Sequence, residues 1–157
     1  MKHVFVLFCC LFSQGILSQT AKNNAISFEL GGGLSFYSLS YERTIVNVDG
    51  HDLSLKVGGM VLPYIFVLGG TQVEIKYGLD ENSNRWNVGI GYRSFSMVGS
   101  KENTSAIYPC LYYRVPSKKD SGFLQLGVMG FIPLNEYKYG FPDNYPGYIS
   151  VGYGLKF

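Results

Sequence analysis

The amino-acid sequence predicts an all-β protein, a single antiparallel up-and-down transmembrane β-barrel of eight strands, with ten strands as the alternative. Apolar and polar residues alternate along almost the whole chain after residue 18, which is the pattern of β-strands with two unlike faces. Only 15% of the 157 residues are charged, whereas about 25% is usual in a soluble domain. The composition therefore disfavours an ordinary water-exposed surface, and the length indicates one domain.

Residues 1–18 have the pattern of a cleaved secretory signal peptide. A short polar start precedes an unbroken apolar run, residues 4–12, which gives way to smaller and more polar residues. This run is too short to cross a bilayer as a helix, which needs about 20 residues. The candidate cleavage sites are, in order of preference, Ser18 and then Gly15 or Ala21. We expect the barrel domain to occupy residues 19–157.

In the first four predicted strands, one face is apolar and the other is small, polar or charged. These strands are residues 25–31, 35–46, 52–60 and 71–79. Their apolar faces carry Ile26, Phe28 and Leu30; Tyr37, Leu39, Tyr41 and Ile45; Leu53, Leu55 and Val57; and Val73, Ile75, Tyr77 and Leu79. A further segment, residues 61–68, is apolar on both faces and contains Pro63.

The remaining predicted strands are residues 86–97, 107–115, 123–134 and 148–157. Their apolar faces carry Trp86, Val88, Ile90 and Tyr92; Ile107, Leu111, Tyr113 and Val115; Leu124, Leu126, Val128 and Ile132; and Ile149, Val151, Tyr153, Leu155 and Phe157. Turn-forming residues separate the segments at 47–50, 69–70, 80–84, 118–122 and 142–147.

Including residues 61–68, the segments number nine, whereas single-chain bacterial barrels have an even number of strands. Two arrangements give eight strands. Either residues 52–68 form one long bent strand, or residues 86–97 lie in an extracellular excursion between Leu79 and Ile107. The sequence leaves both open.

The polar faces indicate a membrane barrel and disfavour a soluble one. A soluble barrel or sandwich turns a charged face to water, but these faces carry mainly Ser, Gly, Gln and Asn, which suit a narrow interior. Trp86 and several tyrosines lie on apolar faces near segment ends, as in the aromatic girdles at lipid interfaces. With the signal peptide, this pattern predicts the outer membrane of a Gram-negative bacterium.

Eight charged residues are expected to face the barrel interior, or lumen. They are Glu29, Glu42, Lys56, Glu74, Lys76, Arg93, Arg114 and Lys156. Because side chains just fill an eight-stranded barrel, we expect these charges to pair with one another and plug the lumen. A narrow channel for small solutes is the alternative.

Few residues suggest catalysis or a cofactor. His51 beside Asp52 lacks a nucleophile and an orienting group, so a solvated turn histidine is the simpler interpretation. Cys110 is the only cysteine after the signal peptide, and no metal-ligand spacing is present. Residues 31–33 are three glycines that precede a strand, so they are no phosphate-binding loop. We expect no enzyme and no cofactor; an outer-membrane enzyme acting on lipid is the third hypothesis.

The aromatic segment 135–147 is predicted to be extracellular. Its Tyr137, Tyr139, Phe141 and Tyr145 suit either contact with an unknown extracellular ligand or anchoring at the membrane rim. The net charge of +2 without a large Lys/Arg cluster gives no reason to expect nucleic acid.

Several short motifs resemble uncharacterised small outer-membrane β-barrel proteins of Gram-negative bacteria. They are residues 29–32 followed by 37–43, residues 68–69 leading into 73–75, and residues 113–116 leading into 122–123. Residues 151–157 resemble the terminal strand that such proteins present to the barrel-assembly machinery, which makes Tyr153, Leu155 and Phe157 a candidate assembly signal. The resemblance implies architecture, location and contact with outer-membrane lipid, and it implies no reaction. We expect a monomer.

Overall fold

The computed structural model describes residues 23–31, 36–49, 51–62, 68–79, 85–97, 103–117, 121–134 and 147–157. The predicted signal peptide with its cleavage sites lies outside these residues, as do Tyr137, Tyr139, Phe141 and Tyr145. Within the described residues, no helix is long and apolar enough to cross a membrane.

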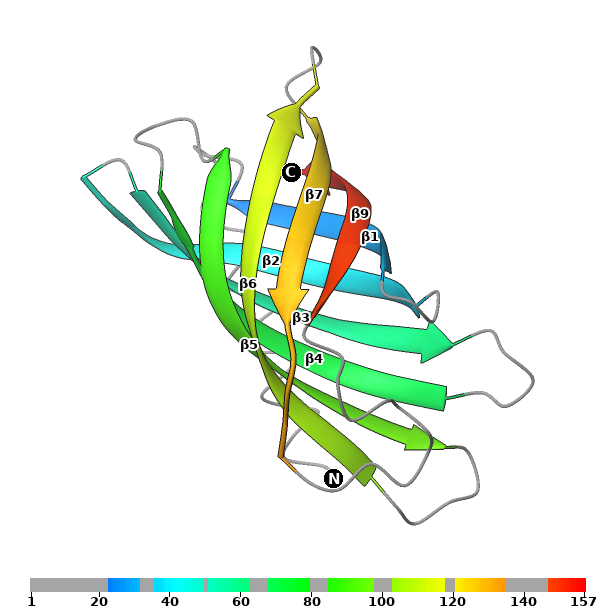
Figure 1. Ribbon diagram of the computed structural model, residues 1–157. Coiled ribbons are helices and arrows are strands. Elements are labelled where there is room, and N and C mark those ends of the chain that lie inside the picture. The colour runs from blue at the N-terminus through cyan, green and yellow to red at the C-terminus, as the bar shows by residue number, and fades with distance from the viewer. Residues whose placement is uncertain are drawn as a thin grey trace, which may run out of the picture.

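Eight long strands form a closed antiparallel barrel, as the alternation predicted (Figure 1). They are β1 (Asn24–Gly31), β2 (Phe36–Val48), β3 (His51–Leu62), β4 (Leu68–Gly78), β5 (Trp86–Met97), β6 (Asn103–Pro116), β7 (Gly122–Gly130) and β9 (Gly147–Lys156). The two-residue β8 (Ile132–Pro133) follows β7 and also pairs with β6. Each long strand pairs with its neighbours in the chain, and β9 closes the ring by pairing with both β7 and β1.

The middle of the barrel differs from both arrangements that the sequence allowed. Residues Trp86–Met97 form β5, which pairs along its length with β4 and β6, so the predicted excursion is wrong. The single bent strand over residues 52–68 is also wrong, because β3 ends at Leu62 and Leu68 already begins β4.

The predicted turn at residues 69–70 is wrong for a packing reason. Both glycines lie within β4, and Gly70 faces the interior, where a side chain would lie 2.7 Å from the Ser94 carbonyl oxygen and 2.9 Å from Met60 Cγ. Glycine is required there by the close approach of neighbouring groups. Two consecutive glycines are typical both of a tight turn and of a crowded strand position, so the local sequence does not distinguish the two.

The β2–β3 connection is a short hairpin turn. Val48 pairs with His51, so only Asp49 and Gly50 lie between the two strands. Asp49 has a φ of 53°, a left-handed conformation that Asp tolerates better than most residues. The predicted turn at residues 47–50 is therefore shorter, and Asn47 and Val48 belong to β2.

Both described termini lie at one end of the barrel, which we call the terminal end. The Asn24 and Phe157 backbones hydrogen-bond to each other there, and the β2–β3, β4–β5 and β6–β7 connections return at the same end. We call the opposite end, where β1 and β3 finish and β9 begins, the loop end. An even number of strands produces this arrangement.

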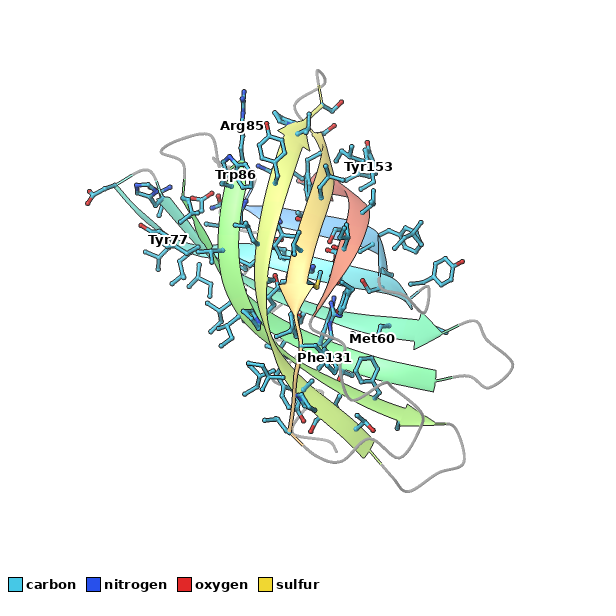
Figure 2. The ribbon with its side chains drawn as sticks, in the orientation of Figure 1. Met60, Tyr77, Arg85, Trp86, Phe131 and Tyr153 are labelled. Atoms are coloured by element: carbon cyan, nitrogen blue, oxygen red, sulfur yellow. The ribbon has the colours of Figure 1, made fainter. Side chains whose placement is uncertain are left out.

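The barrel is inverted relative to a soluble protein. Apolar side chains face outward, and exposure reaches 62% at Leu39 and 70% at Ile149, whereas Lys56 and Tyr112 inside are 0% exposed. Figure 2 shows Tyr77, Trp86 and Tyr153 projecting from the outer surface. The core is consequently polar and lies in the lumen.

Candidate functional site: the charged lumen

Alternation along the strands places seven of the eight predicted charged residues in the lumen. These are Glu29, Glu42, Lys56, Glu74, Lys76, Arg93 and Arg114, each at most 7% exposed. Lys156 is only half-buried and lines a cavity at the terminal end. The strands that supply these residues are spread around the whole ring, so the side chains converge from all sides.

Glu42 is the centre of one cluster. The Arg114 guanidinium donates two hydrogen bonds to it, at 2.9 Å to Oε1 and 2.5 Å to Oε2. Lys76 Nζ forms a salt bridge with Oε2 of the same carboxylate. Two neighbouring cations therefore depend on one carboxylate, and the bidentate arginine fixes its orientation.

A second cluster is built on Glu29. Lys56 Nζ forms a salt bridge with Glu29 Oε1, and Gln125 Nε2 donates to the same oxygen at 3.0 Å. Arg114 Nε donates to Gln125 Oε1 at 2.8 Å. The Gln125 amide thereby links the Glu29 cluster to the Glu42 cluster.

Glu74 is held mainly by tyrosine hydroxyls. Tyr108 and Tyr112 each donate to Glu74 Oε2 at 2.9 Å, while Lys56 Nζ is 3.9 Å from that oxygen. The Tyr112 ring also lies 5.1 Å from the Lys56 ammonium and 5.3 Å from that of Lys76. Cation–π attraction is strongest where the cation is desolvated, as it is here.

Sequence reasoning missed part of this lumen. Alternation puts Tyr112 on the polar face of its strand with Cys110 and Arg114, but the charged residues alone gave no role to Tyr112 or Tyr108, and both are buried inside. The spacing along β6 could have identified both tyrosines as inward, because residues 108, 110, 112 and 114 occupy one face of this strand and Arg114 was already assigned to the interior. Gln72 and Gln125 share inward positions in the same way; Gln72 Nε2 donates to Ser40 Oγ at 2.6 Å.

Arg93 differs from the other lumen cations. Its guanidinium lies 4.2 Å from the Tyr108 ring centroid and 5.2 Å from that of Tyr148. Its Nη2 approaches Met129 Sδ at 3.3 Å. Among the described residues no carboxylate forms a salt bridge with it.

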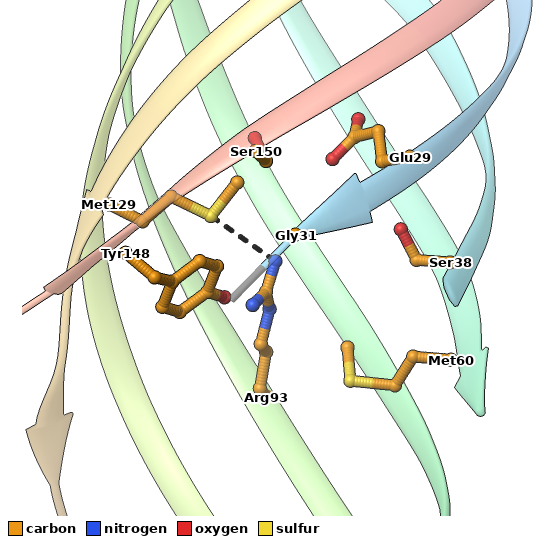
Figure 3. A pocket seen from close by; sticks show the side chains of 8 residues that line it. All are labelled: Glu29, Gly31, Ser38, Met60, Arg93, Met129, Tyr148 and Ser150. Carbon is orange, nitrogen blue, oxygen red and sulfur yellow. Dashed lines mark hydrogen bonds between the residues drawn. The ribbon is translucent and has the colours of Figure 1, made fainter. Parts of the chain in front are cut away.

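Two small cavities lie among the described residues of the lumen. A cavity of about 10 Å³ lies near the loop end, between Arg93, Tyr148 and Met60 (Figure 3). Another, of about 30 Å³, lies near the terminal end between Glu42, Arg114 and Lys156. A cavity needs about 10–15 Å³ to hold one water molecule, so these spaces suit single waters or ions.

The other candidate residues are not brought together. His51 begins β3, half-buried, with Nδ1 3.0 Å from the Gly78 carbonyl oxygen and its ring stacked on Tyr77, so the solvated turn position is wrong. Cys110 is a buried free thiol in the lumen. The described residues contain no group of three or more His, Cys, Asp or Glu placed to hold a metal.

The candidate assembly residues share the outward face of the last strand. Tyr153 and Leu155 in β9, and Phe157 directly after it, are 52%, 49% and 57% exposed. They remain outside the lumen network and make no contribution to its charge balance.

No family model matches the chain, and no curated protein matches its sequence. Among solved structures, the chain is similar to the N-terminal β-barrel domain of Pseudomonas aeruginosa OprF. The TM-score is 0.51 at 14% sequence identity, covering 86% of this chain and 98% of that one. At this identity the likeness concerns the fold, a small closed barrel.

Proposed function

We propose that the mature chain is an integral β-barrel of the outer membrane of a Gram-negative bacterium, with a plugged lumen and a structural or surface-interaction role. The observation that carries this proposal is the inverted distribution of residues. Outward faces of all eight long strands expose large apolar side chains, including Phe28, Ile75, Ile90, Val128 and Val151. Soluble monomers rarely expose apolar patches beyond a few hundred Å², whereas lipid matches such a surface.

Aromatic residues on the outer surface support the same proposal. Trp86 and Tyr113 pack together near the terminal end, with ring centroids 4.7 Å apart. Tyr77 lies near this end on the neighbouring strand. Such side chains suit the boundary between hydrocarbon and headgroups. We therefore propose that the terminal end faces the periplasm and the loop end faces outward.

Fractionation and gel mobility test the proposed location. The mature protein should be recovered with outer membranes, and detergent-folded protein should migrate differently before and after heating because a closed barrel resists unfolding. Recovery as a soluble periplasmic protein without detergent would overturn the proposal.

The plugged lumen is supported by the three carboxylate clusters and the small cavities. A planar-bilayer recording should show no steady single-channel conductance. Resolvable, reproducible conductance would favour the narrow channel for small solutes over the plug. Charged side chains line part of both cavities, and such a channel would use them; they are Glu29 and Arg93 in one, and Glu42, Arg114 and Lys156 in the other.

We assign the surface-interaction role to residues 135–147, with contacts from Tyr137, Tyr139, Phe141 and Tyr145. Replacing residues 136–146 with a short Gly/Ser linker should leave the heat-dependent gel shift intact. The amount of protein bound to immobilised glycans should then differ between the wild-type and linker proteins when the two are tested side by side. Equal binding by both would contradict this assignment.

We propose that the barrel functions as a monomer and that the barrel-assembly machinery recognises Tyr153, Leu155 and Phe157. Ring closure leaves β9 without a free edge, so the assembly machinery would bind this strand before the ring closes. Phe157→Ala should lower the amount of assembled barrel in cells while refolding of the purified protein in detergent is unchanged. Equal losses in both assays would indicate a stability effect instead.

A further inference from the structure

The loop-end cavity gathers polar atoms that lack a hydrogen-bond partner among the described residues. These atoms are Arg93 Nε, the Tyr148 hydroxyl, Ser150 Oγ and Glu29 Oε2, and all four residues line the cavity. Figure 3 shows Arg93 directed toward Tyr148 and Met129, with Ser150 and Glu29 on the neighbouring wall. Because buried polar groups are nearly always paired, this convergence points to a bound polar ligand.

The charge balance indicates the sign of that ligand. The buried cations of the described lumen are Lys56, Lys76, Arg93 and Arg114, and the buried carboxylates are Glu29, Glu42 and Glu74. Four positive charges against three negative charges leave one positive charge in excess. The carboxylates are engaged by Lys56, Lys76, Arg114 and the two tyrosine hydroxyls. Arg93 is the cation of this buried set that forms no salt bridge with any of the three carboxylates.

We propose that Arg93, Tyr148 and Ser150 bind a single small inorganic anion, a halide such as chloride, in this cavity. The guanidinium supplies the charge and an N–H donor, and the two hydroxyls supply O–H donors. The small size of the cavity, about 10 Å³, favours a monatomic ion over sulfate, phosphate and organic acids. Met60 and Met129 line it with flexible, polarisable side chains that adjust to a monatomic ion.

Glu29 on the same wall does not reverse this preference. Its Oε1 is bound by the Lys56 ammonium and by the Gln125 amide, so only its Oε2 is left toward the cavity. Arg93, in contrast, is held by aromatic rings and a thioether, which provide no countercharge. On the cavity wall the unpartnered donors of Arg93, Tyr148 and Ser150 thus outnumber the one unpartnered carboxylate oxygen, Glu29 Oε2.

Chloride titration of the folded mature barrel in a non-ionic detergent tests the site. Gluconate, which is too large for the cavity, keeps the ionic strength constant. The unfolding temperature of the wild-type protein should rise with chloride and then saturate, because a ligand that binds only the folded state stabilises it. Arg93→Gln should abolish the rise. Lys156→Gln, which removes a cation at the terminal end, should retain it.

Chlorine NMR line broadening gives a direct readout that does not depend on unfolding. The folded wild-type protein should broaden the chloride signal, and Tyr148→Phe with Ser150→Ala should weaken binding about tenfold or more through lost hydrogen bonds. This double variant keeps Arg93 and serves if Arg93→Gln fails to fold. A wild-type protein that responds equally to chloride and gluconate would overturn the proposal and leave water as the occupant. Both assays use detergent, so their failure leaves the proposed membrane location untouched.

Discussion

Glu42 is shared by two buried cations of the lumen. It is the carboxylate for both Lys76 and Arg114, and all three side chains are buried. Burying charges is costly unless they are paired and hydrogen-bonded. Removing the shared partner therefore affects two cations together, whereas removing either cation leaves Glu42 with the other.

Glu42→Gln should lower the free energy of unfolding by about 3–5 kcal/mol, the usual cost of breaking a buried ion pair. Urea titration of the protein folded in detergent or lipid measures the loss. Asp49→Asn is the matched control, because this carboxylate is exposed and Asn also tolerates the left-handed backbone. The control should change stability by less than about 0.5 kcal/mol. Equal effects of the two substitutions would contradict the shared-partner interpretation.

Tyr108→Phe and Tyr112→Phe should each cost about 1.5–3 kcal/mol, because each removes a hydrogen bond to the buried Glu74 carboxylate. The ring remains in both variants, so cation–π contacts are retained. The two losses should not add, since both hydroxyls serve one oxygen. Tyr92→Phe, on the outer surface, should have little effect. If the lumen variants match Tyr92→Phe in urea titrations, Glu74 has other donors.

At the scale of strands, glycine on one strand makes room for an aromatic residue on the next. Gly91 on β5 pairs with Tyr108 on β6, and a side chain at Gly91 would lie 2.2 Å from Tyr108 Cζ. Gly154 on β9 has the same relation to Phe123 on β7. These pairs let large rings fold across the lumen, so inward glycines and inward rings together fill the barrel.

Gly91→Ala should destabilise the barrel by about 1–3 kcal/mol through overpacking, since Tyr108 is held by Glu74 and cannot move freely. Gly69→Ala is the matched control, because no atom lies within 4 Å of its added methyl group. Alanine there should be neutral or stabilising by up to about 1 kcal/mol. Similar losses at the two positions would show that backbone freedom, and not the Tyr108 ring, sets the cost.

For the whole molecule, closure of the ring and the placement of apolar side chains outside and charged ones inside depend on each other. Closure gives each of the eight long strands a neighbouring strand on both sides, which is the condition for crossing a hydrocarbon layer with strands. The outer face can then be apolar, and the charges are confined to the lumen. The cost of an outward charge should accordingly depend on depth.

Ile90→Arg, near the middle of β5, should cost about 2–4 kcal/mol for the protein folded in lipid vesicles, and Leu79→Arg at the terminal end about 0–1 kcal/mol. Both side chains face outward in the folded barrel, with 57% and 48% exposure. Urea titration in vesicles measures the difference. A water-soluble barrel would tolerate both substitutions about equally, and that result would contradict the membrane location.

The fold class and the inward set of charges follow from alternation alone, because strand side chains alternate strictly between two faces. Glu29, Glu42, Lys56 and Glu74 could therefore be assigned to the lumen without any knowledge of strand pairing. The middle of the barrel could not be resolved in this way. Residues 69–70 carry the same local signal for a turn and for a crowded strand, and only the neighbouring Ser94 and Met60 distinguish them.

Partner choice inside the lumen was decided by the tertiary structure. Arg114 reaches Glu42 across 72 residues of sequence, and Gln125 reaches Glu29 across 96. Which side chains meet depends on the stagger of the strands and on ring closure, and neither is encoded in the parity of a single strand. The same geometry gives Arg93 aromatic neighbours and, within the described part of the chain, no salt bridge to a carboxylate. Alternation thus determines which residues enter the lumen, and the closed register determines which charges neutralise one another there.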